Sequence, residues 1–395
     1  MRVSVARAKR LIGEIGKRPL AIGQRNLGLD FVRSVAILLV VFSHGLQFMG
    51  DWPARLGLDG GKFGFSTGVL GVEIFFCLSG FLIGSILLDL QATRAQGNSV
   101  RIFMIRRWMR TLPLYYLTLL ALFLVPAFDP SARHAVWRYL LFLQNFVTPM
   151  PDGNWFGTSW SLTIEEWSYV ILPVLAFRVL RNTREPVALA AVVLCVVAFA
   201  LRLAATRSDA EWDLTVRKVM ETRVDAIAYG VLLAWQLRNG GERAARWLTM
   251  AAPISLCAIG ISLWTVIDAH RAASFFGRIF ALPLMAVAIC AFLPLLSKLR
   301  LPDAVAAPVR FVAKISYSLY LVHWPCMMLT AAFVASWQWT CYAASAFALA
   351  TVVSFSIEQP IMRLRPRQQD VPGQLSQALS RLRRILKGSL ISTVR

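Results

Sequence analysis

The stretch GVLGVEIFFCLSGFLIGSILLD, residues 68–89, is apolar almost throughout, and Glu73 is its single internal carboxylate. The hydrocarbon core of a bilayer is about 30 Å thick, and a helix rising about 1.5 Å per residue needs about 20 apolar residues to cross it. Residues 68–89 meet that requirement. The stretch therefore predicts a membrane-spanning helix.

The chain contains nine further runs of the same kind, so it is predicted to be an all-α bundle of about ten transmembrane helices. Two spans are less regular, because the fourth opens with a pair of carboxylates and the sixth is short and contains Asp225. No loop is long enough for a separate soluble catalytic domain, so any chemistry is expected inside the bundle. The predicted spans are residues 32–50, 68–89, 111–128, 161–178, 186–205, 223–237, 247–267, 276–297, 311–334 and 336–358.

Composition and charge agree with a membrane protein. Hydrophobic residues make up 57% of the chain and charged residues 16%, which excludes a soluble globular domain of this size. The net charge of +21 does not indicate a nucleic-acid partner, because the basic residues lie between apolar runs rather than on one folded surface. With the N-terminus inside, 31 of the 42 Lys and Arg residues fall in cytoplasmic segments, which predicts that both termini are cytoplasmic. Contact with anionic lipid is expected on the same side.

The chain is divided into a basic cytoplasmic segment (1–31), a transmembrane domain (32–358) and a basic cytoplasmic tail (359–395). Leucine and isoleucine recur at helical spacing in the tail, which predicts an interfacial amphipathic helix or, equally, a disordered basic tail. The six cysteines lie inside apolar runs without C-x-x-C spacing, so we interpret them as core residues and expect no metal site.

Ionisable side chains inside the predicted spans indicate a functional site, because charge in hydrocarbon is costly. Arg33 stands at the cytoplasmic start of the first span, and His44 follows eleven residues later, about 16 Å deeper in the membrane. Glu165 reaches a similar depth in the fourth span, and His323 lies about 13 Å into the ninth. Imidazole and carboxylate at one level suit general acid–base catalysis and equally a proton relay in a transporter.

A second cluster is predicted at the cytoplasmic mouth. The segment RRWMRTLPLYY, residues 106–116, places Arg107 and Arg110 on one helical face at the membrane level of Arg33. Arginine side chains bind phosphate through two parallel hydrogen bonds, so the cluster is a candidate phosphate site. The alternative is that these arginines are ordinary anchors on the positive side of the membrane.

Six segments in order resemble the acyltransferase-3 family of integral-membrane acyltransferases, and the resemblance spans residues 27–365. The first, LDFVRSVAILLVVFSHG (29–45), is similar to the family's R-x10-H signature through Arg33 and His44. Thr111 replaces the branched aliphatic residue usual after the second arginine of the third segment. The other five segments are GVEIFFCLSGFLIG (71–84), RRWMRTLPLYY (106–116), TSWSLTIEEWSYVILPVL (158–175), RVDAIAYGVLLA (223–234) and ISYSLYLVHWP (315–325).

The resemblance implies transfer of an acyl group, most often acetyl, from cytoplasmic acyl-CoA as co-substrate, with no bound cofactor. Arg33, Arg107 and Arg110 would hold the phosphates of CoA at the inner mouth. His44 would act as the general base on the acceptor hydroxyl or take the acyl group covalently, and the sequence leaves both routes open. Glu165 would orient His44 or the acceptor.

The acceptor implied by the resemblance is a hydroxyl of a cell-surface saccharide or of a lipid-linked precursor. Exopolysaccharide, O-antigen, glucan and lipid-linked oligosaccharide all remain open. The chain resembles family members without a fused extracytoplasmic hydrolase-like domain. Glu166 is interpreted as a helix-cap or lipid-interface residue. The residues expected to line the acceptor side are Trp160, Ser161, Tyr317, Tyr320 and His323, with Glu73, Arg223 and Asp225 as supporting candidates.

The competing hypothesis is a proton-coupled transporter or flippase that uses the same midplane histidines and carboxylates. The two halves of the chain show no inverted repeat and no paired broken helices, which disfavours a transporter. The chain contains no N-x-S/T acceptor sequence, which agrees with a bacterial inner-membrane protein. The sequence therefore favours a membrane O-acyltransferase.

Overall fold

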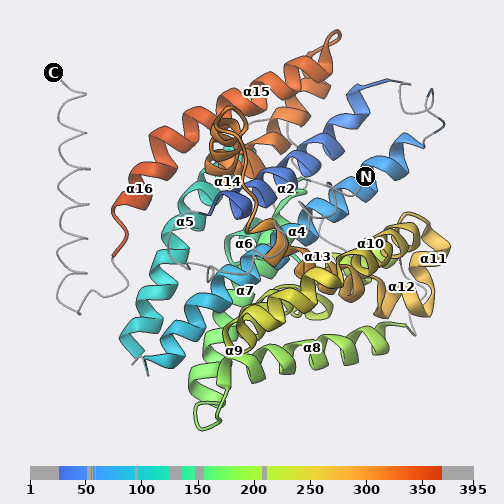
Figure 1. The fold of residues 1–395 in the computed structure, drawn as a ribbon. Helices are drawn as coiled ribbons and strands as arrows, with labels where there is room; N and C mark the ends of the chain where they lie inside the picture. Colours follow the sequence, from blue (N-terminus) through green and yellow to red (C-terminus); the bar gives the residue numbers. More distant parts are fainter. Residues whose placement is uncertain are drawn as a thin grey trace, which may run out of the picture.

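The computed structural model describes residues 26–50, 55, 57, 59–93, 97–124, 136–146, 155–206 and 211–366. All regular structure over these residues is helical, which confirms the predicted all-α fold class (Figure 1). The predicted basic segment up to residue 25 and the predicted amphipathic helix of the tail, after residue 366, lie outside the described residues.

Within the described part of the chain, five helices are long and apolar enough to cross a bilayer, or six if a pair bent by 57° counts as one span. The bent pair is α9 (Ala228–Met250), preceded by η5 (Glu221–Arg223), and α10 (Ala252–Val266). The protein is therefore a multi-pass membrane protein. The five spans are α2 (Leu27–Gly45) with η1 (Leu46–Phe48), α4 (Gly60–Ala92), α8 (Pro186–Ala205), α14 (Asp303–Phe333), and α15 (Gln338–Val353) with η6 (Ser354–Glu358) and α16 (Gln359–Arg363).

Each of the ten predicted spans overlaps one of the observed helices, but not every helix is long enough to cross a membrane alone. The eighth predicted span coincides with α13, which has only 16 residues. The total of ten crossings therefore stays a prediction. The remaining elements are α5 (Gly97–Leu124), α6 (Val136–Leu140), α7 (Ser159–Val174), η3 (Leu175–Val179), η4 (Asp213–Arg217), α11 (Ala269–Ala273), α12 (Phe275–Ile279) and α13 (Ala281–Leu296).

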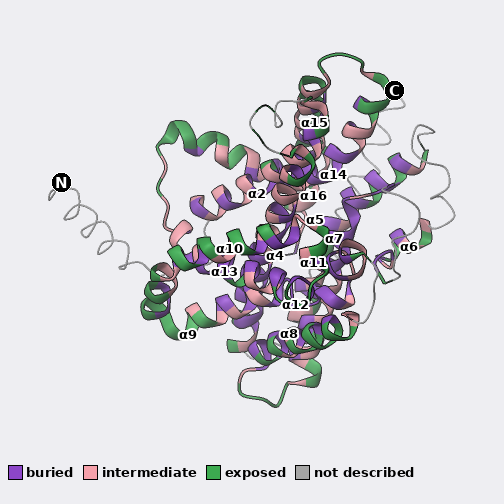
Figure 2. Ribbon diagram, turned by 90° about the vertical axis from the view of Figure 1, so that its right-hand side faces the viewer, coloured by how far each residue is buried: buried purple, intermediate pink, exposed green. Residues whose placement is uncertain are grey.

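Helix α4 lies at the centre of the bundle, in contact with α2, α9 and α13 (Figures 1 and 2). The outer helices α8 and α15 expose apolar side chains such as Val196 and Val352, which are 60% and 61% exposed. Apolar side chains on the outside suit contact with lipid tails. Cys257 and Cys341 are also exposed, so the prediction that all six cysteines lie in the core is wrong for these two.

Glycines allow α4 and α9 to pack backbone against backbone. A Cβ atom on Gly80 would lie 2.0 Å from the carbonyl oxygen of Ile227, and one on Gly230 would lie 2.3 Å from that of Cys77. Close approach through small residues is the usual means of helix association in membranes, where no hydrophobic force draws helices together. The contact fixes α9 against the helix that carries the walls of both cavities described below.

We predict that Gly80→Ala destabilises the protein, because the added methyl group meets backbone that cannot move without separating the helices. Overpacking of this kind typically costs about 1–3 kcal/mol. The measurement is the temperature at which half of the detergent-solubilised protein is lost from the monodisperse peak. Gly260→Ala is the matched control, because a Cβ there meets no atom within 4 Å. Equal melting temperatures for the two variants would contradict the prediction.

Candidate active site

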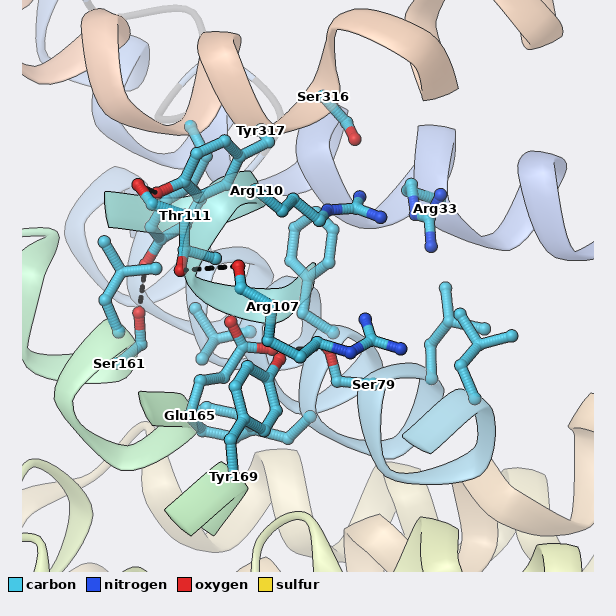
Figure 3. Close-up of a pocket in the computed structure, with 17 residues that line it drawn as sticks. Arg33, Ser79, Arg107, Arg110, Thr111, Ser161, Glu165, Tyr169, Ser316 and Tyr317 are labelled. Atoms are coloured by element: carbon cyan, nitrogen blue, oxygen red, sulfur yellow. Dashed lines mark hydrogen bonds between the residues drawn. The ribbon is translucent and has the colours of Figure 1, made fainter. Parts of the chain in front are cut away.

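The three arginines predicted to bind phosphate meet in one pocket. Arg33 comes from α2, and Arg107 and Arg110 come from α5; Figure 3 shows the side chains of Arg107 and Arg110 extending toward the side of the pocket where Arg33 lies. Glu165 and Tyr169 of α7 complete the wall opposite. We call this space, with a cavity volume of about 80 Å³, the arginine pocket.

The arginine pocket carries positive charge that is not compensated by an ion pair. Among the described residues, no carboxylate lies within ion-pair distance of Arg33, Arg107 or Arg110. Arg107 instead faces the rings of Phe103 and Tyr169, at 5.6 and 5.9 Å from their centres. Guanidinium groups gathered without a counter-ion form a site for an anionic ligand, and their paired donors match phosphate.

The two adjacent glutamates of α7 are both turned into the protein. Glu165 accepts a hydrogen bond from the hydroxyl of Ser79 on α4 and lines the arginine pocket. Glu166 is only 6% exposed and sits two turns after the start of α7 at Ser159. The interpretation of Glu166 as a helix-cap or lipid-interface residue is therefore wrong, because the helix begins earlier than the carboxylates and that face packs inward.

His44 lines a second and larger space, with a cavity volume of about 660 Å³, which we call the histidine cavity. Its walls include Gly64 and Gly68 of α4, Trp160 of α7 and Trp324 of α14. A cavity of this size is in the range that holds small ligands. The structure thus separates the predicted residues into two neighbouring spaces rather than one.

His44 and His323 form a hydrogen-bonded pair. Nδ1 of His44 lies 3.1 Å from Nε2 of His323, and Nδ1 of His323 lies 3.0 Å from the carbonyl oxygen of Leu319. Because a carbonyl oxygen can only accept, Nδ1 of His323 carries a proton, and Nε2 of a neutral His323 then accepts the proton of His44 Nδ1. This arrangement leaves Nε2 of His44 as the nitrogen that can take up a proton. His323 itself is fully buried, and His44 is half-buried in the cavity wall.

The two spaces share a wall. Val72 and Tyr320 line both of them, and the hydroxyl of Tyr320 lies 2.5 Å from that of Ser161, which faces the arginine pocket. A molecule held in the arginine pocket would reach His44 only by passing this wall. The hydrogen bond between Ser161 and Tyr320 is part of this wall.

The residues expected on the acceptor side are divided by this wall. Trp160 lines the histidine cavity, whereas Ser161 and Tyr317 line the arginine pocket, where the hydroxyl of Tyr317 donates to the carbonyl oxygen of Thr111 at 2.6 Å. Glu165, expected to orient His44 or the acceptor, lies on the arginine side and not on the wall that holds His44.

The three supporting candidates line neither space and form buried ion pairs. Arg223 donates to Glu73 at 2.5 Å, and both side chains are at most 2% exposed. Arg202 donates two hydrogen bonds to Asp225, at 3.0 and 2.7 Å, from an equally buried position. Sequence reasoning missed Arg202, although a cation inside the fifth predicted span requires a partner. These pairs join α4 and α8 to the segment that leads into α9, without lining either space.

Other residues of the site were also missed. Asp213 and Arg217 of η4, and Lys218 directly after it, line the histidine cavity. Arg365 lies near the arginines of α5: its burial, together with Arg110, Arg106 and Arg107, lowers the pKa of Arg365 to about 10. These residues lie outside the predicted spans, so their depth in the membrane could not be calculated from their position in a helix. Across the described residues, no three His, Cys, Asp or Glu side chains are placed to hold a metal ion.

Comparison with known proteins gives one family. A family model described as an acyltransferase domain matches residues 26–359. A Bacillus subtilis protein provisionally named a peptidoglycan O-acetyltransferase is 27% identical over 340 residues, which are 77% of this chain and 49% of the relative. The peptidoglycan O-acetyltransferase of Listeria monocytogenes is 24% identical over 375 residues, 85% of this chain and 55% of its own. The chain spans about half the length of these relatives. No solved structure matches the chain.

We predict that Asp225→Asn lowers stability, because it leaves Arg202 buried without its counter-ion. Removing one partner of a buried ion pair costs about 3–5 kcal/mol, whereas replacing both partners by apolar groups is often close to neutral. Asp225→Asn is therefore expected to melt well below wild type in detergent, and the double variant Arg202→Met with Asp225→Leu to recover most of the loss.

The matched control for that experiment is Asp89→Asn, because Asp89 pairs with Arg238 in an exposed position and such pairs contribute little. If Asp225→Asn has the same melting temperature as Asp89→Asn and wild type, the structural role assigned to the ion pair of Arg202 and Asp225 is wrong.

Proposed function

The chain belongs to the acyltransferase-3 family, and from this premise we propose that it transfers an acetyl group from cytoplasmic acetyl-CoA to a hydroxyl of a cell-surface saccharide. It is a multi-pass membrane enzyme of the O-acetyltransferase class. The main support for the proposal is an arginine pocket whose three arginines form no ion pair among the described residues, next to a separate cavity that presents His44.

The arginine pocket suits the donor. CoA carries phosphates at one end and a thioester at the other, joined by a slender pantetheine arm. Arg33, Arg107 and Arg110 are proposed to bind the phosphates through charge-assisted hydrogen bonds, with Arg365 nearby as an additional cation. The cavity volume of about 80 Å³ is too small for a saccharide, so the acceptor is assigned to the histidine cavity. Glu165, fixed by Ser79, is proposed to position the donor on this side.

The histidine cavity suits the acceptor. Nε2 of His44 takes the proton of the acceptor hydroxyl, whose oxygen attacks the thioester carbonyl. The oxygen–acyl bond forms, the carbon–sulfur bond breaks, and the proton passes to the departing CoA thiolate. His323 keeps the proton of His44 on Nδ1, so that Nε2 remains free for this step. Trp160 lines this cavity on the acceptor side, and Tyr320 is proposed to stand where the two substrates meet.

The proposed orientation places each space on the appropriate side of the membrane. With ten spans, both termini cytoplasmic and 31 of 42 basic residues inside, Arg33 stands near the cytoplasmic end of α2 and His44 nearer the outer end. The transmembrane domain is proposed to cover 32–358, between a basic N-terminal segment and a basic tail at the inner face of a bacterial inner membrane. Acetyl-CoA is made in the cytoplasm, so its phosphates would enter at the arginines.

The acceptor class rests on the relatives. Both relatives are named for O-acetylation of peptidoglycan. A cell-surface glycan or its lipid-linked precursor is therefore the proposed acceptor of this chain. A transporter using the same histidines and carboxylates was the competing hypothesis. Membership of an acyltransferase family selects the enzyme, and the unpaired arginines suit a phosphate-bearing donor rather than a proton path.

We predict that His44→Ala reduces transfer of label from radiolabelled acetyl-CoA in inner-membrane vesicles by about 10²-fold or more, the usual contribution of a general base. The assay compares vesicles with matched amounts of protein, and a melting curve in detergent confirms folding. Label that remains on the wild-type protein after quenching would indicate the acyl-histidine route. Activity of His44→Ala equal to wild type would refute the role of His44.

We predict that Arg110→Ala raises the KM for acetyl-CoA by about tenfold or more, because a hydrogen bond to a charged group contributes about 1.5–3 kcal/mol. The kcat is expected to change less, since the phosphates lie far from the reacting carbonyl. The control is Arg101→Ala, which removes an exposed arginine of the same helix outside the pocket wall. A similar KM in both variants would show that Arg110 is only a membrane anchor.

A further inference from the structure

The histidine cavity has a cationic cluster on one wall. Asp213 lies between two cations: it accepts a hydrogen bond from the guanidinium of Arg217 and lies 2.6 Å from the ammonium nitrogen of Lys218. The guanidinium of Arg217 also stands 4.7 Å from the ring centre of Trp160 and 5.2 Å from that of Phe65. All three charged groups line the same cavity as His44.

The cluster has one positive charge more than its own carboxylate can balance. Burial alone would raise the pKa of Asp213, but Arg217 and Lys218 lower it to about 2, so the carboxylate is ionised at neutral pH. Burial and Arg217 lower the pKa of Lys218, whereas the carboxylates of Asp213 and Glu211 act to raise it. Within the described residues, these three are the only acidic or basic side chains other than His44 in the cavity wall.

Neutral hydrogen bonds also hold the backbone around the cluster in place. The side-chain amide of Asn145 donates to the backbone carbonyls of Trp160 at 2.6 Å and Lys218 at 2.8 Å, and the indole of Trp212 donates to Gly277. The hydroxyl of Thr222 closes the loop by donating to Val216 at 2.8 Å. Because the backbone is fixed by neutral hydrogen bonds, the excess charge is available to a ligand.

Topology gives no other reason for these cations. Lys and Arg are favoured on the cytoplasmic side, and this loop lies on the outer side in the proposed orientation. An uncompensated cation near hydrocarbon is costly unless an anion joins it. A saccharide that brings its own anion would supply that charge at the moment it places a hydroxyl near His44.

We propose that the acceptor is an anionic saccharide, whose carboxylate or phosphate binds Lys218 and Arg217 while a neighbouring hydroxyl lies at Nε2 of His44. The inference rests on the proposed function and narrows its acceptor class. Lys218 is 17% exposed and lacks the aromatic contacts of Arg217. A bound anion would therefore stabilise the charge of Lys218 more than that of Arg217. Lys218 and Arg217 are thus specificity residues, not participants in acyl transfer.

The first test measures the charge of the product and needs no variant of the cluster. Vesicles are incubated with radiolabelled acetyl-CoA, label formed by His44→Ala vesicles is subtracted, and the glycan product is passed over an anion exchanger at neutral pH. Retention is expected. Retention that survives mild acid, which cleaves glycosyl pyrophosphates, assigns the anion to a carboxylate, and retention lost on mild acid assigns it to phosphate. A neutral labelled product overturns the inference while leaving the proposed function intact.

The second test separates substrate binding from a structural role. Lys218→Gln is expected to raise the KM for the purified acceptor by about tenfold, with the KM for acetyl-CoA unchanged, since one charge-assisted hydrogen bond is lost. Lys218→Arg should restore most of the affinity. Lys62→Gln is the control, because Lys62 is exposed on α4 and lies outside the cavity wall. Equal acceptor KM in Lys218→Gln and Lys62→Gln overturns the inference, and absence of any label transfer in wild type overturns it together with the proposed function.

Discussion

Buried charge is the constraint on which the rest of this structure depends. A charged side chain inside a membrane bundle must be paired within the protein or bind a ligand, because lipid tails provide neither a counter-ion nor a hydrogen-bond partner. Arg202 is paired with Asp225 and Arg223 with Glu73, and none of these four residues lines either cavity. Arg107 and Arg110 have no such partner in the described structure and face a pocket. Arginine thus stabilises the fold in the buried ion pairs and is available to a ligand in the arginine pocket.

The second organising feature is the wall between the two cavities. Tyr320 faces both spaces and meets Ser161 across a short hydrogen bond, so the arginine pocket and the histidine cavity are adjacent but separate. In the proposed function, this partition lets a donor and an acceptor meet without an open channel. The pair of His44 and His323 stands on the side of the histidine cavity, with Nε2 of His44 free.

Much of the site could be predicted from the sequence, and the reasons for its limits are physical. Arg33, Arg107 and Arg110 were expected at one membrane level, and the structure brings them to one pocket, because rise per residue converts position into depth. The same arithmetic placed His44 and His323 close in depth, and they form hydrogen bonds with each other. It also placed Glu165 beside His44, where the structure instead has it among the arginines. The depth of a residue in the membrane does not determine in which direction its side chain points around the helix axis.

The sequence by itself determined that this is an all-α, multi-pass membrane protein of the acyltransferase-3 family, because apolar length and motif order are properties of the chain. Only the tertiary structure decided which ionisable groups are paired. Arg202 and Asp225 are 23 residues apart, and Glu73 and Arg223 are 150 apart, so no spacing rule predicts that they meet. Loop residues such as Lys218 are harder still to place, since a loop has no periodicity from which side-chain direction follows. Partner choice is settled by packing between helices, which local sequence does not encode.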